Sequence, residues 1–257
     1  MNKVDLNLPI RVGATVIGPL SILQMNTEEA VQLVRTSVRL RYPVEIAICN
    51  AHTTLTALDN PAFAATLQEM TLLNDGIGVD LASRFLTGKG FPDNLNGTDL
   101  VPAILSDIDL PLRIFLLGAN ESRVQLAKDH IERVYPQHQV VGARNGYFDL
   151  ADSSAVCTEI NRTSPDLLLV GMGNPRQENF IVQNRANLDA TVAIGVGALF
   201  DFMSGSVIRA PKMVQAAGLE WLFRLLQEPR RLFHRYVIGI PRFFAALIRL
   251  KYGKPEI

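Results

Sequence analysis

The feature that most constrains the fold is a repeated alternation of short apolar runs with longer helical patterns. Five apolar runs are bounded by turn residues, and helical patterns such as 121–135 and 177–187 lie between them. Strands that are apolar on both faces and separated by helices are typical of parallel sheets. The sequence therefore predicts an α/β fold with a mostly parallel, Rossmann-like sheet and helices on both faces. The predicted strands are Val44–Cys49, Arg113–Gly118, Gln139–Gly142, Asp166–Gly171 and Ala190–Val196.

The chain changes character after Gly205. Two helical stretches, 219–227 and 229–251, replace the alternation, and a break is expected near Pro241 because proline cannot donate a helical hydrogen bond. Ten basic and three acidic residues give positions 205–257 a net charge of +7, although the 25 basic and 25 acidic residues of the whole chain cancel. We therefore predict an α/β core over residues 1–204 and a basic, amphipathic helical appendage over residues 205–257.

The appendage mixes aromatic and arginine side chains along one helical pattern. Phe233 and Phe244 lie among Arg231, Arg235 and Arg242. Aromatic residues beside arginines suit a helix at a lipid surface, with the charges held at the level of the headgroups. The alternative is an ordinary amphipathic helix that packs its apolar face on the core. The pattern favours the lipid surface but leaves both interpretations open.

Composition and spacing argue against several classes of protein. The absence of net charge argues against a general nucleic-acid-binding protein. Cys49 and Cys157 are too few for a disulfide framework or a cysteine zinc site, and they fit a reducing compartment. The four histidines have no metal-ligand spacing. No uncharged apolar stretch reaches the ~18–20 residues that span a bilayer, and the N-terminus does not resemble a signal peptide.

Four loops are candidates for ligand binding. In open parallel sheets ligands bind beyond the carboxyl ends of the strands, and each of these loops follows an apolar run and precedes a helix. Glycines such as Gly118, Gly171 and Gly173 let backbone amides approach a phosphate, and a helix N-terminus favours an anion. The residues alone therefore predict an anionic or nucleotide ligand. The four loops are Cys49–Thr53, Asn74–Gly78, Gly118–Asn120 and Gly171–Glu178.

Better-known ligand motifs are incomplete in this sequence. The glycines at 171 and 173 lack the third glycine of a dinucleotide fingerprint and have Arg176 in its place. No phosphate-binding loop ending in Gly-Lys-Ser/Thr occurs. Asp107 and Asp109 imitate the Asp-x-Asp metal clamp of sugar-nucleotide transferases. Their position in a loop before the strand at Arg113 favours capping or turn roles instead.

Asp75 is the most suggestive carboxylate. It lies between the apolar pair 72–73 and Gly76, where a strand ends and a helix begins. Such an aspartate is commonly a helix cap, and a helix N-terminus lowers a carboxylate pKa, which works against a role as a base. Gln177 has a similar alternative, because it lies three residues after Asn174 and fits a capping arrangement.

Several motifs resemble those of the WecG/TagA/CpsF glycosyltransferases, glycosyltransferase family 26. The sequence Gly-Met-Gly-Asn-Pro-Arg-Gln-Glu at 171–178 is similar to the family pattern Gly-x-Gly-x-Pro-Lys/Arg-Gln-Glu. The matching pieces occur in family order over roughly residues 10 to 240, and together they are specific. The others are 74–78, 96–100, 195–201, 209–211, 220–225 and 228–231.

The resemblance implies an activity and the residues that perform it. It implies an inverting, metal-independent transfer, without a cofactor, of a sugar from a UDP-sugar to a polyprenyl-diphosphate-linked saccharide in bacterial surface polysaccharide assembly. On the family pattern Asp75 is the general base for the acceptor hydroxyl, and Gln177 lies beside the reacting sugars. Asn50 and Thr53 match a polar loop after the early strand. Asn96 and the three glycines named above complete the expected substrate-binding set.

The resemblance also gives the appendage a role. Arg224, Arg230 and Arg231 match family arginines that engage the lipid-linked diphosphate, in agreement with the net charge of +7. The expected partners are the UDP-sugar, the polyprenyl-linked acceptor and the anionic inner surface of the plasma membrane, with a homo-oligomer possible and no nucleic acid. The protein is therefore expected in the cytoplasm, peripherally attached to that membrane.

One departure and two alternatives accompany this prediction. Asn94 lies three residues before Gly97, where many members have an arginine, and the difference bears on donor or acceptor choice. The main alternative is a non-catalytic component that binds nucleotide or polyprenyl phosphate, although Asp75 and Gln177 together favour catalysis. A nicotinamide-dependent oxidoreductase is disfavoured by the incomplete glycine fingerprint. The sequence does not name the sugar.

Overall fold

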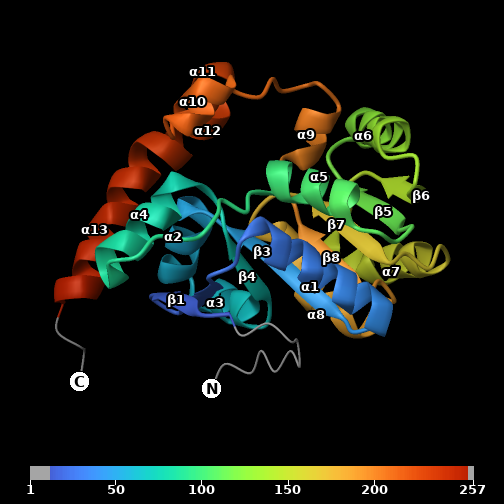
Figure 1. Ribbon diagram of the computed structural model, residues 1–257, viewed down its shortest axis with the longest axis horizontal. Helices are drawn as coiled ribbons and strands as arrows, with labels where there is room; N and C mark the ends of the chain where they lie inside the picture. Colours follow the sequence, from blue (N-terminus) through green and yellow to red (C-terminus); the bar gives the residue numbers. More distant parts are fainter. Residues whose placement is uncertain (1–11, 254–257) are drawn as a thin grey trace.

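The fold is organised around a six-stranded parallel sheet (Figure 1). The structure, a computed structural model, describes residues 12–253, so the ends of the predicted core and appendage at 1–11 and 254–257 lie outside the described residues. The strand order β4-β3-β8-β7-β5-β6 confirms the predicted α/β class. The strands are β3 Val44–Cys49, β4 Thr71–Asn74, β5 Arg113–Gly118, β6 Gln139–Arg144, β7 Leu167–Gly171 and β8 Val192–Gly195.

Helices cover both faces of the sheet because neighbouring strand residues point to opposite apolar clusters. Ile46 and Leu169 pack in one cluster, whereas Ala47 and Leu168 pack in the other. The first face is covered by α1 Thr27–Leu40, α5 Gly97–Asp107, α6 Glu121–Val134 and α9 Leu199–Met203. The second is covered by α2 Ala51–Asp59, α3 Pro61–Gln68, α4 Gly76–Thr87, α7 Ser153–Asn161 and α8 Arg176–Asn184.

Smaller elements complete the core. An antiparallel hairpin of β1 Ala14–Ile17 and β2 Leu20–Leu23, which the apolar runs did not predict, buries Ile17 and Leu20 beside the second face. Single 3₁₀ turns precede α7 at Leu150–Asp152 and extend α8 at Arg185–Asn187.

The strand order creates a reversal between β5 and β7 at the carboxyl edge of the sheet. The chain leaves β5 through α6 toward β6, whereas it leaves β7 through α8 toward β8 on the other side. Ligands of open α/β sheets bind in the crevice where the direction reverses. The fold therefore singles out the loops after β5 and β7.

Asparagines fix the loops at this edge. Asn50, Asn96 and Asn120 are the N-caps of α2, α5 and α6, and each side chain accepts a backbone N–H from the first turn. A cap of this kind stabilises a helix by ~1 kcal/mol. The start of each helix, and the direction of the loop before it, is thereby set by a local polar contact.

The described part of the appendage is mostly helical from Lys212 onward. The break predicted near Pro241 is displaced: Pro241 lies in the first turn of α13, and the irregularity is the π-helical turn η3 just before it. A proline ring clashes with the carbonyl four residues earlier, which here is Val237 in that turn. The elements are α10 Lys212–Ala216, α11 Glu220–Gln227, α12 Pro229–Phe233, η3 His234–Ile238 and α13 Gly239–Tyr252.

The last helix returns to the core. In Figure 1, α13 runs beside α2 and α4, and its Phe243 and Leu247 are buried in the cluster of the second face. The packing predicted as the alternative for the appendage is therefore present on this face of α13.

Candidate active site

Asp75 lies where the loops after β3 and β4 converge. It occupies the N-cap position of α4, but its side chain makes no capping hydrogen bond. The backbone turns here through Gly76, whose φ of +78° favours glycine. The carboxylate instead accepts a 3.2 Å hydrogen bond from Nδ2 of Asn50, while the Asp75 N–H donates to the Cys49 carbonyl at 2.8 Å. One carboxylate oxygen is thus directed along the edge of the sheet rather than into the helix.

Asn50 is oriented by its own helix. Its Oδ1 accepts the backbone N–H groups of His52 and Thr53, each at 3.1 Å, and the hydroxyl of Thr53 at 3.3 Å. These contacts turn Nδ2 toward Asp75. The structure therefore brings together Asn50, Thr53 and Asp75, with Thr53 buried behind the other two.

Burial raises the pKa of Asp75 and outweighs the groups that act against it. The hydrogen bond from Asn50 and the positive charges of Arg235 and Arg224 lower this pKa, while the charge of Asp99 raises it further. The lowering expected from the helix N-terminus is not the dominant effect, because the side chain does not cap the helix. The result is a carboxylate of increased basicity close to two arginines.

Those two arginines come from the appendage. Arg224 of α11 lies 5.1 Å from the ring centroid of Phe202 and 3.7 Å from Glu228. Arg235 comes from the π-helical turn, and its charge also helps to lower the pKa of His52 to about 4, after burial as the larger cause. Both guanidinium groups therefore lie near the carboxyl ends of β3 and β4.

The other two predicted arginines are placed differently. Arg231 pairs with Glu228 at 2.7 Å and with Asp201 at 3.7 Å, whereas Arg230 is exposed. Sequence reasoning missed Arg235 as a site residue. Positions 224, 228, 231 and 235 follow the three- and four-residue spacing of one helical face, so the spacing was a signal that could have found it.

A second charged cluster joins the core to the appendage. Arg209 pairs with Asp99 of α5 at 2.5 Å and with Glu220 of α11 at 3.7 Å. Asn96 supports it, since its side chain accepts the backbone N–H of Asp99 and donates to the Asp99 carboxylate at 2.7 Å. The side chain of Asn96, predicted to bind substrate, is thus used within the first turn of α5.

Gln177 is buried behind the β7–α8 loop. Its Oε1 accepts the N–H of Gly197 at 3.1 Å and its Nε2 donates to Glu178 at 2.8 Å. The capping alternative is wrong, because α8 has no side-chain cap. Burial raises the pKa of Glu178 and of Cys49, and the charges of Glu178 and Asp75 both add to the rise at Cys49. Glu178, which sequence reasoning missed, therefore lies near Cys49, as Asp75 does.

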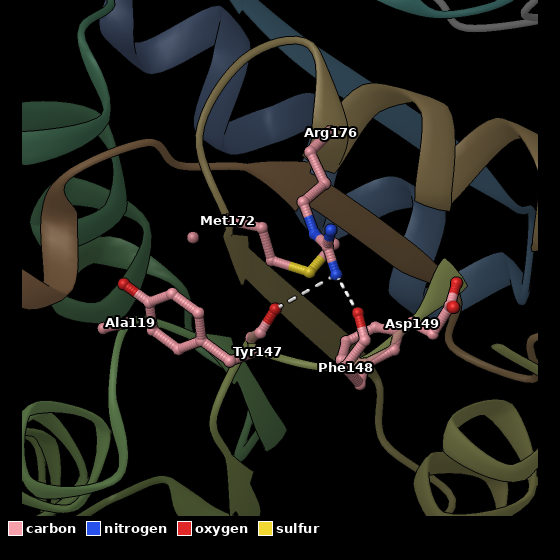
Figure 2. A pocket seen from close by; sticks show the side chains of 8 residues that line it. Ala119, Tyr147, Phe148, Asp149, Met172 and Arg176 are labelled. Atoms are coloured by element: carbon pink, nitrogen blue, oxygen red, sulfur yellow. Dashed lines mark hydrogen bonds between the residues drawn. The ribbon is translucent and has the colours of Figure 1, made fainter. Parts of the chain in front are cut away.

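A cavity of about 520 Å³ opens at the reversal between β5 and β7 (Figure 2). Its lining combines the side chains of Tyr147, Phe148 and Met172 with the backbone of two glycines. Two charged side chains, Arg176 and Asp149, complete it. Figure 2 shows Arg176 reaching to the segment after β6, where its guanidinium donates to the Phe148 carbonyl and lies 5.4 Å from the Phe148 ring centroid. The cavity therefore joins an aromatic wall to a polar backbone floor.

Glycines at the cavity, such as Gly171, and beside it are required for steric reasons. Gly118 faces Gly171 in the β5–β7 register, and a Cβ on Gly118 would lie 2.3 Å from the Gly171 carbonyl oxygen. Gly173 has a φ of +77°. Larger residues would force the strand ends apart or strain the loop, so the glycines keep backbone groups accessible at the cavity.

Residues 12–253 contain no group of three or more His, Cys, Asp or Glu side chains placed to hold a metal ion. Asp109, from the Asp-x-Asp pattern, instead pairs with Arg35 at 2.9 Å and with Arg39 at 2.8 Å. Asp109 therefore serves in ion pairs with α1 rather than in the capping or turn role that the sequence predicted.

The outer face of the last helices is apolar and exposed. Its side chains recur at intervals of four or seven residues, and two of them directly follow the buried Phe243 and Leu247 in the helix. In the described part of the chain, no helix combines the length and apolar character needed to cross a bilayer. The exposed residues are Phe233, Val237, Phe244, Ile248 and Tyr252, and we call them the outer stripe.

Comparison with known proteins adds independent information. The profile of the glycosyl transferase WecG/TagA/CpsF family matches residues 15–256. An N-acetylglucosaminyldiphosphoundecaprenol N-acetyl-beta-D-mannosaminyltransferase of Bacillus spizizenii is 33% identical over 206 residues, 79% of this chain and 78% of the relative. The enzyme of the same name from Bacillus subtilis is 33% identical over 192 residues, 72% of this chain and 73% of the relative.

Proposed function

The chain belongs to the WecG/TagA/CpsF family of glycosyltransferases, and we propose that it transfers a sugar from a UDP-sugar to a polyprenyl-diphosphate-linked saccharide with inversion of configuration. The observation that carries this proposal is the placement of Asp75. It combines a raised pKa, a side chain free of capping duty and two approaching arginines at the ligand-binding edge of the sheet.

Asp75 acts in this proposal as the general base. The hydroxyl oxygen of the acceptor attacks the anomeric carbon of the donor while its proton passes to the Asp75 carboxylate. The bond between the anomeric carbon and the UDP oxygen breaks, and its electron pair leaves on the diphosphate. A single displacement of this kind needs one base near the acceptor, and a raised carboxylate pKa brings that base closer to the pH at which it operates.

The cavity at β5 and β7 is the proposed nucleotide site. Tyr147 has 79% of its surface exposed and offers a flat face for a base. The loop after β7 leads into α8, so its backbone N–H groups and the helix N-terminus favour the diphosphate. Gly118, Gly171 and Gly173 contribute by leaving this backbone uncovered.

Charge on the departing UDP and on the lipid diphosphate requires stabilisation, which we assign to arginines and backbone amides rather than to a metal or cofactor. Arg224 and Arg235 are the appendage arginines whose charges reach Asp75. Guanidinium groups bind phosphate oxygens in pairs, and preorganised donors of this kind are worth several kcal/mol at a developing charge. Gln177 supports the loop after β8 through Gly197 and lies behind the proposed donor sugar.

We propose that the outer stripe docks the protein on the anionic inner face of the plasma membrane. The stripe leaves apolar side chains in water on a segment whose net charge, over residues 205–257, is +7. A helix at a lipid surface buries such side chains while basic groups meet anionic headgroups, each worth ~1 kcal/mol. This arrangement would present the lipid-linked acceptor to Asp75 from the side of the appendage.

A transfer assay tests the proposal. Radiolabelled UDP-sugars, beginning with UDP-N-acetylmannosamine because of the names of the two relatives, are incubated with polyprenyl-diphospho-N-acetylglucosamine in detergent with and without EDTA. We expect label in the lipid product, unchanged by EDTA, and an inverted anomeric configuration.

Other outcomes would be equally informative. UDP binding without transfer across the donor and acceptor panel would favour a non-catalytic binding component of the same machinery. Loss of transfer with EDTA would contradict the proposed independence from metal. Failure to bind UDP would contradict the proposal that the donor is a UDP-sugar.

A further inference from the structure

We propose that Phe202 is a positioning residue for Arg224, whose guanidinium it holds ready for the diphosphate of the lipid-linked acceptor. This inference rests on the proposed role of Arg224 in binding that diphosphate. It adds a side chain of the core, just beyond the motif at 195–201, to a phosphate-binding site so far described through the appendage.

Phe202 is presented by a short helix that is fixed to the core. In α9 the side chains of Leu199 and Phe200 are buried in the cluster of the first face. Asp201 joins the same helix to α6 through an ion pair with Arg123 at 2.8 Å. Phe202 follows these anchors and is only half-buried, so its ring is available to the appendage.

The ring supports a guanidinium that has few other contacts. The Cζ of Arg224 lies over the Phe202 ring, 5.1 Å from its centroid, within the range at which an aromatic face attracts a guanidinium. Its Nε is buried and has no hydrogen-bond partner among residues 12–253. The carboxylate of Glu228 lies 3.7 Å from Arg224, beyond hydrogen-bond distance, and only 2.7 Å from Arg231. The main support of Arg224 is therefore an aromatic face.

This kind of support leaves Arg224 better prepared for a diphosphate than its neighbour Arg231. Arg231 pairs with Glu228 and with Asp201, so a phosphate would have to compete with two carboxylates. A ring attracts the cation through its face and leaves the N–H groups of Arg224 for phosphate oxygens. The charge of Arg224 also helps to lower the pKa of Asp75, so the guanidinium lies near the proposed base. A diphosphate bound there would bring its sugar toward that base.

Two substitutions at position 202 test the ring. Phe202→Leu keeps an apolar side chain but removes the aromatic face, whereas Phe202→Tyr retains that face. With polyprenyl-diphospho-N-acetylglucosamine in detergent, Phe202→Leu should raise the KM of this acceptor about three- to tenfold. The kcat at saturating acceptor and the KM of the UDP-sugar should be retained, because the lost contact serves acceptor binding alone. Phe202→Tyr should behave as the wild type.

A double-mutant cycle tests whether the ring acts through the arginine. Arg224→Ala alone should raise the KM of the acceptor at least as much as Phe202→Leu does. In the Arg224→Ala background, Phe202→Leu should cause no further rise, because the effects of two residues in one contact do not add. Additive effects would show that Phe202 acts by another route, and would overturn the positioning role.

Phe85 provides a matched control at the other end of α4 from Asp75. Lys251 of the appendage lies 4.2 Å from the centroid of the Phe85 ring. Phe85→Leu therefore removes a contact of the same kind between core and appendage, and it should leave the KM of the acceptor in detergent unchanged. An equal rise in Phe85→Leu and Phe202→Leu would indicate a general loosening of the appendage and would contradict the inference.

Binding of the same lipid in detergent micelles without donor separates this inference from the proposed function. If the wild type binds the lipid without transferring sugar, weaker binding in Phe202→Leu and normal binding in Phe202→Tyr would overturn the reaction and support the role of Phe202. An active wild type whose acceptor KM and lipid Kd are unchanged by Phe202→Leu, or are not restored by Phe202→Tyr, would overturn the role of Phe202 alone. Failure of the wild type to bind the lipid would overturn both.

Discussion

At the β3–β4 end of the sheet the candidate site is built around a carboxylate and two arginines, whereas at the β5–β7 end it consists mainly of backbone and aromatic surface, with Arg176 and Asp149 as its charged side chains. The first end holds Asp75 with Arg224 and Arg235, and burial there raises a carboxylate pKa. The second end has glycines at the strand termini and Tyr147 beside a cavity. Changes at the first end should therefore affect turnover, and changes at the second should affect donor binding.

The appendage contributes unequally to the two ends. Its arginines act on Asp75, and α13 packs beside α2 and α4, which follow the strands of that same end. A membrane-docked acceptor would arrive at the β3–β4 end, and the soluble donor would enter at the β5–β7 end. The division between turnover and donor binding follows from which substrate each end meets.

The largest effect should come from removing the base. Asp75→Asn keeps the size of the side chain and removes the proton acceptor, so kcat should fall ~10²–10⁴-fold. The affinity for UDP, measured by calorimetry, should remain unchanged because the cavity lies at the other end of the sheet. Asp107→Asn, an exposed substitution at the end of α5, serves as the matched control. Weakened UDP binding in Asp75→Asn would break the proposed separation of the two ends.

Membrane binding should depend on the outer stripe. Phe244→Ser combined with Ile248→Ser removes two exposed apolar side chains, each worth ~1.5–3 kcal/mol when buried, so co-sedimentation with anionic vesicles should weaken at least tenfold. These substitutions are preferable to truncation, because α13 also buries Phe243 and Leu247 in the core. Leu126→Ser, at an exposed apolar residue of α6, is the control. Equal sedimentation of all the variants would exclude the stripe as a docking surface.

Removal of Arg235 should change both rate and pH dependence. Its positive charge lowers the pKa of Asp75, so Arg235→Ala should raise that pKa and move the acid limb of kcat to higher pH. Loss of one phosphate-binding group should lower kcat/KM for the lipid acceptor by about ten- to thirtyfold. Arg230→Ala, at an exposed position, should have a smaller effect. A larger fall of kcat/KM in Arg230→Ala than in Arg235→Ala would favour Arg230, the residue that the sequence motif predicts, as the phosphate-binding arginine.

The smallest effect concerns the nucleotide site. Tyr147→Ala removes the exposed aromatic face and should raise the Kd of UDP by about five- to tenfold, since stacking of a base is worth ~1–3 kcal/mol. Tyr147→Phe retains the ring and should bind UDP normally. The kcat at saturating donor should change little in both. A fall in kcat with an unchanged Kd of UDP would indicate that Tyr147 acts in the transfer step and not in donor binding.

Much of the sheet was predictable from the sequence. The apolar runs at Val44–Cys49 and Arg113–Gly118 coincide with β3 and β5, because strands buried on both faces need continuous apolar residues. The hairpin of β1 and β2 was missed, since two four-residue strands carry little periodic signal. Sequence order also cannot show which strands become neighbours, and therefore it could not show where the β5–β7 reversal lies.

The site was predictable in part and for a different reason. The loop residues Asn50 and Asp75 follow strands that pair directly, so their proximity follows from the fold. The hydrogen bond from the Gly76 N–H to the Asn94 side chain was not predictable, because it joins residues 18 positions apart through a loop without regular structure. Arg235 lies in a π-helical turn, and such turns have no reliable sequence signature, so its place near Asp75 could not be predicted.

The most direct test of the central claim is the pH dependence of kcat in the wild-type enzyme and in Asp75→Asn, measured from pH 4 to 9 with saturating donor and acceptor. If the half-buried Asp75 carboxylate is the base, the wild type should show an acid limb above the ordinary aspartate pKa of ~3.9, and the residual turnover of Asp75→Asn should lack that limb. The same acid limb in both enzymes would contradict the assignment of Asp75 as the general base.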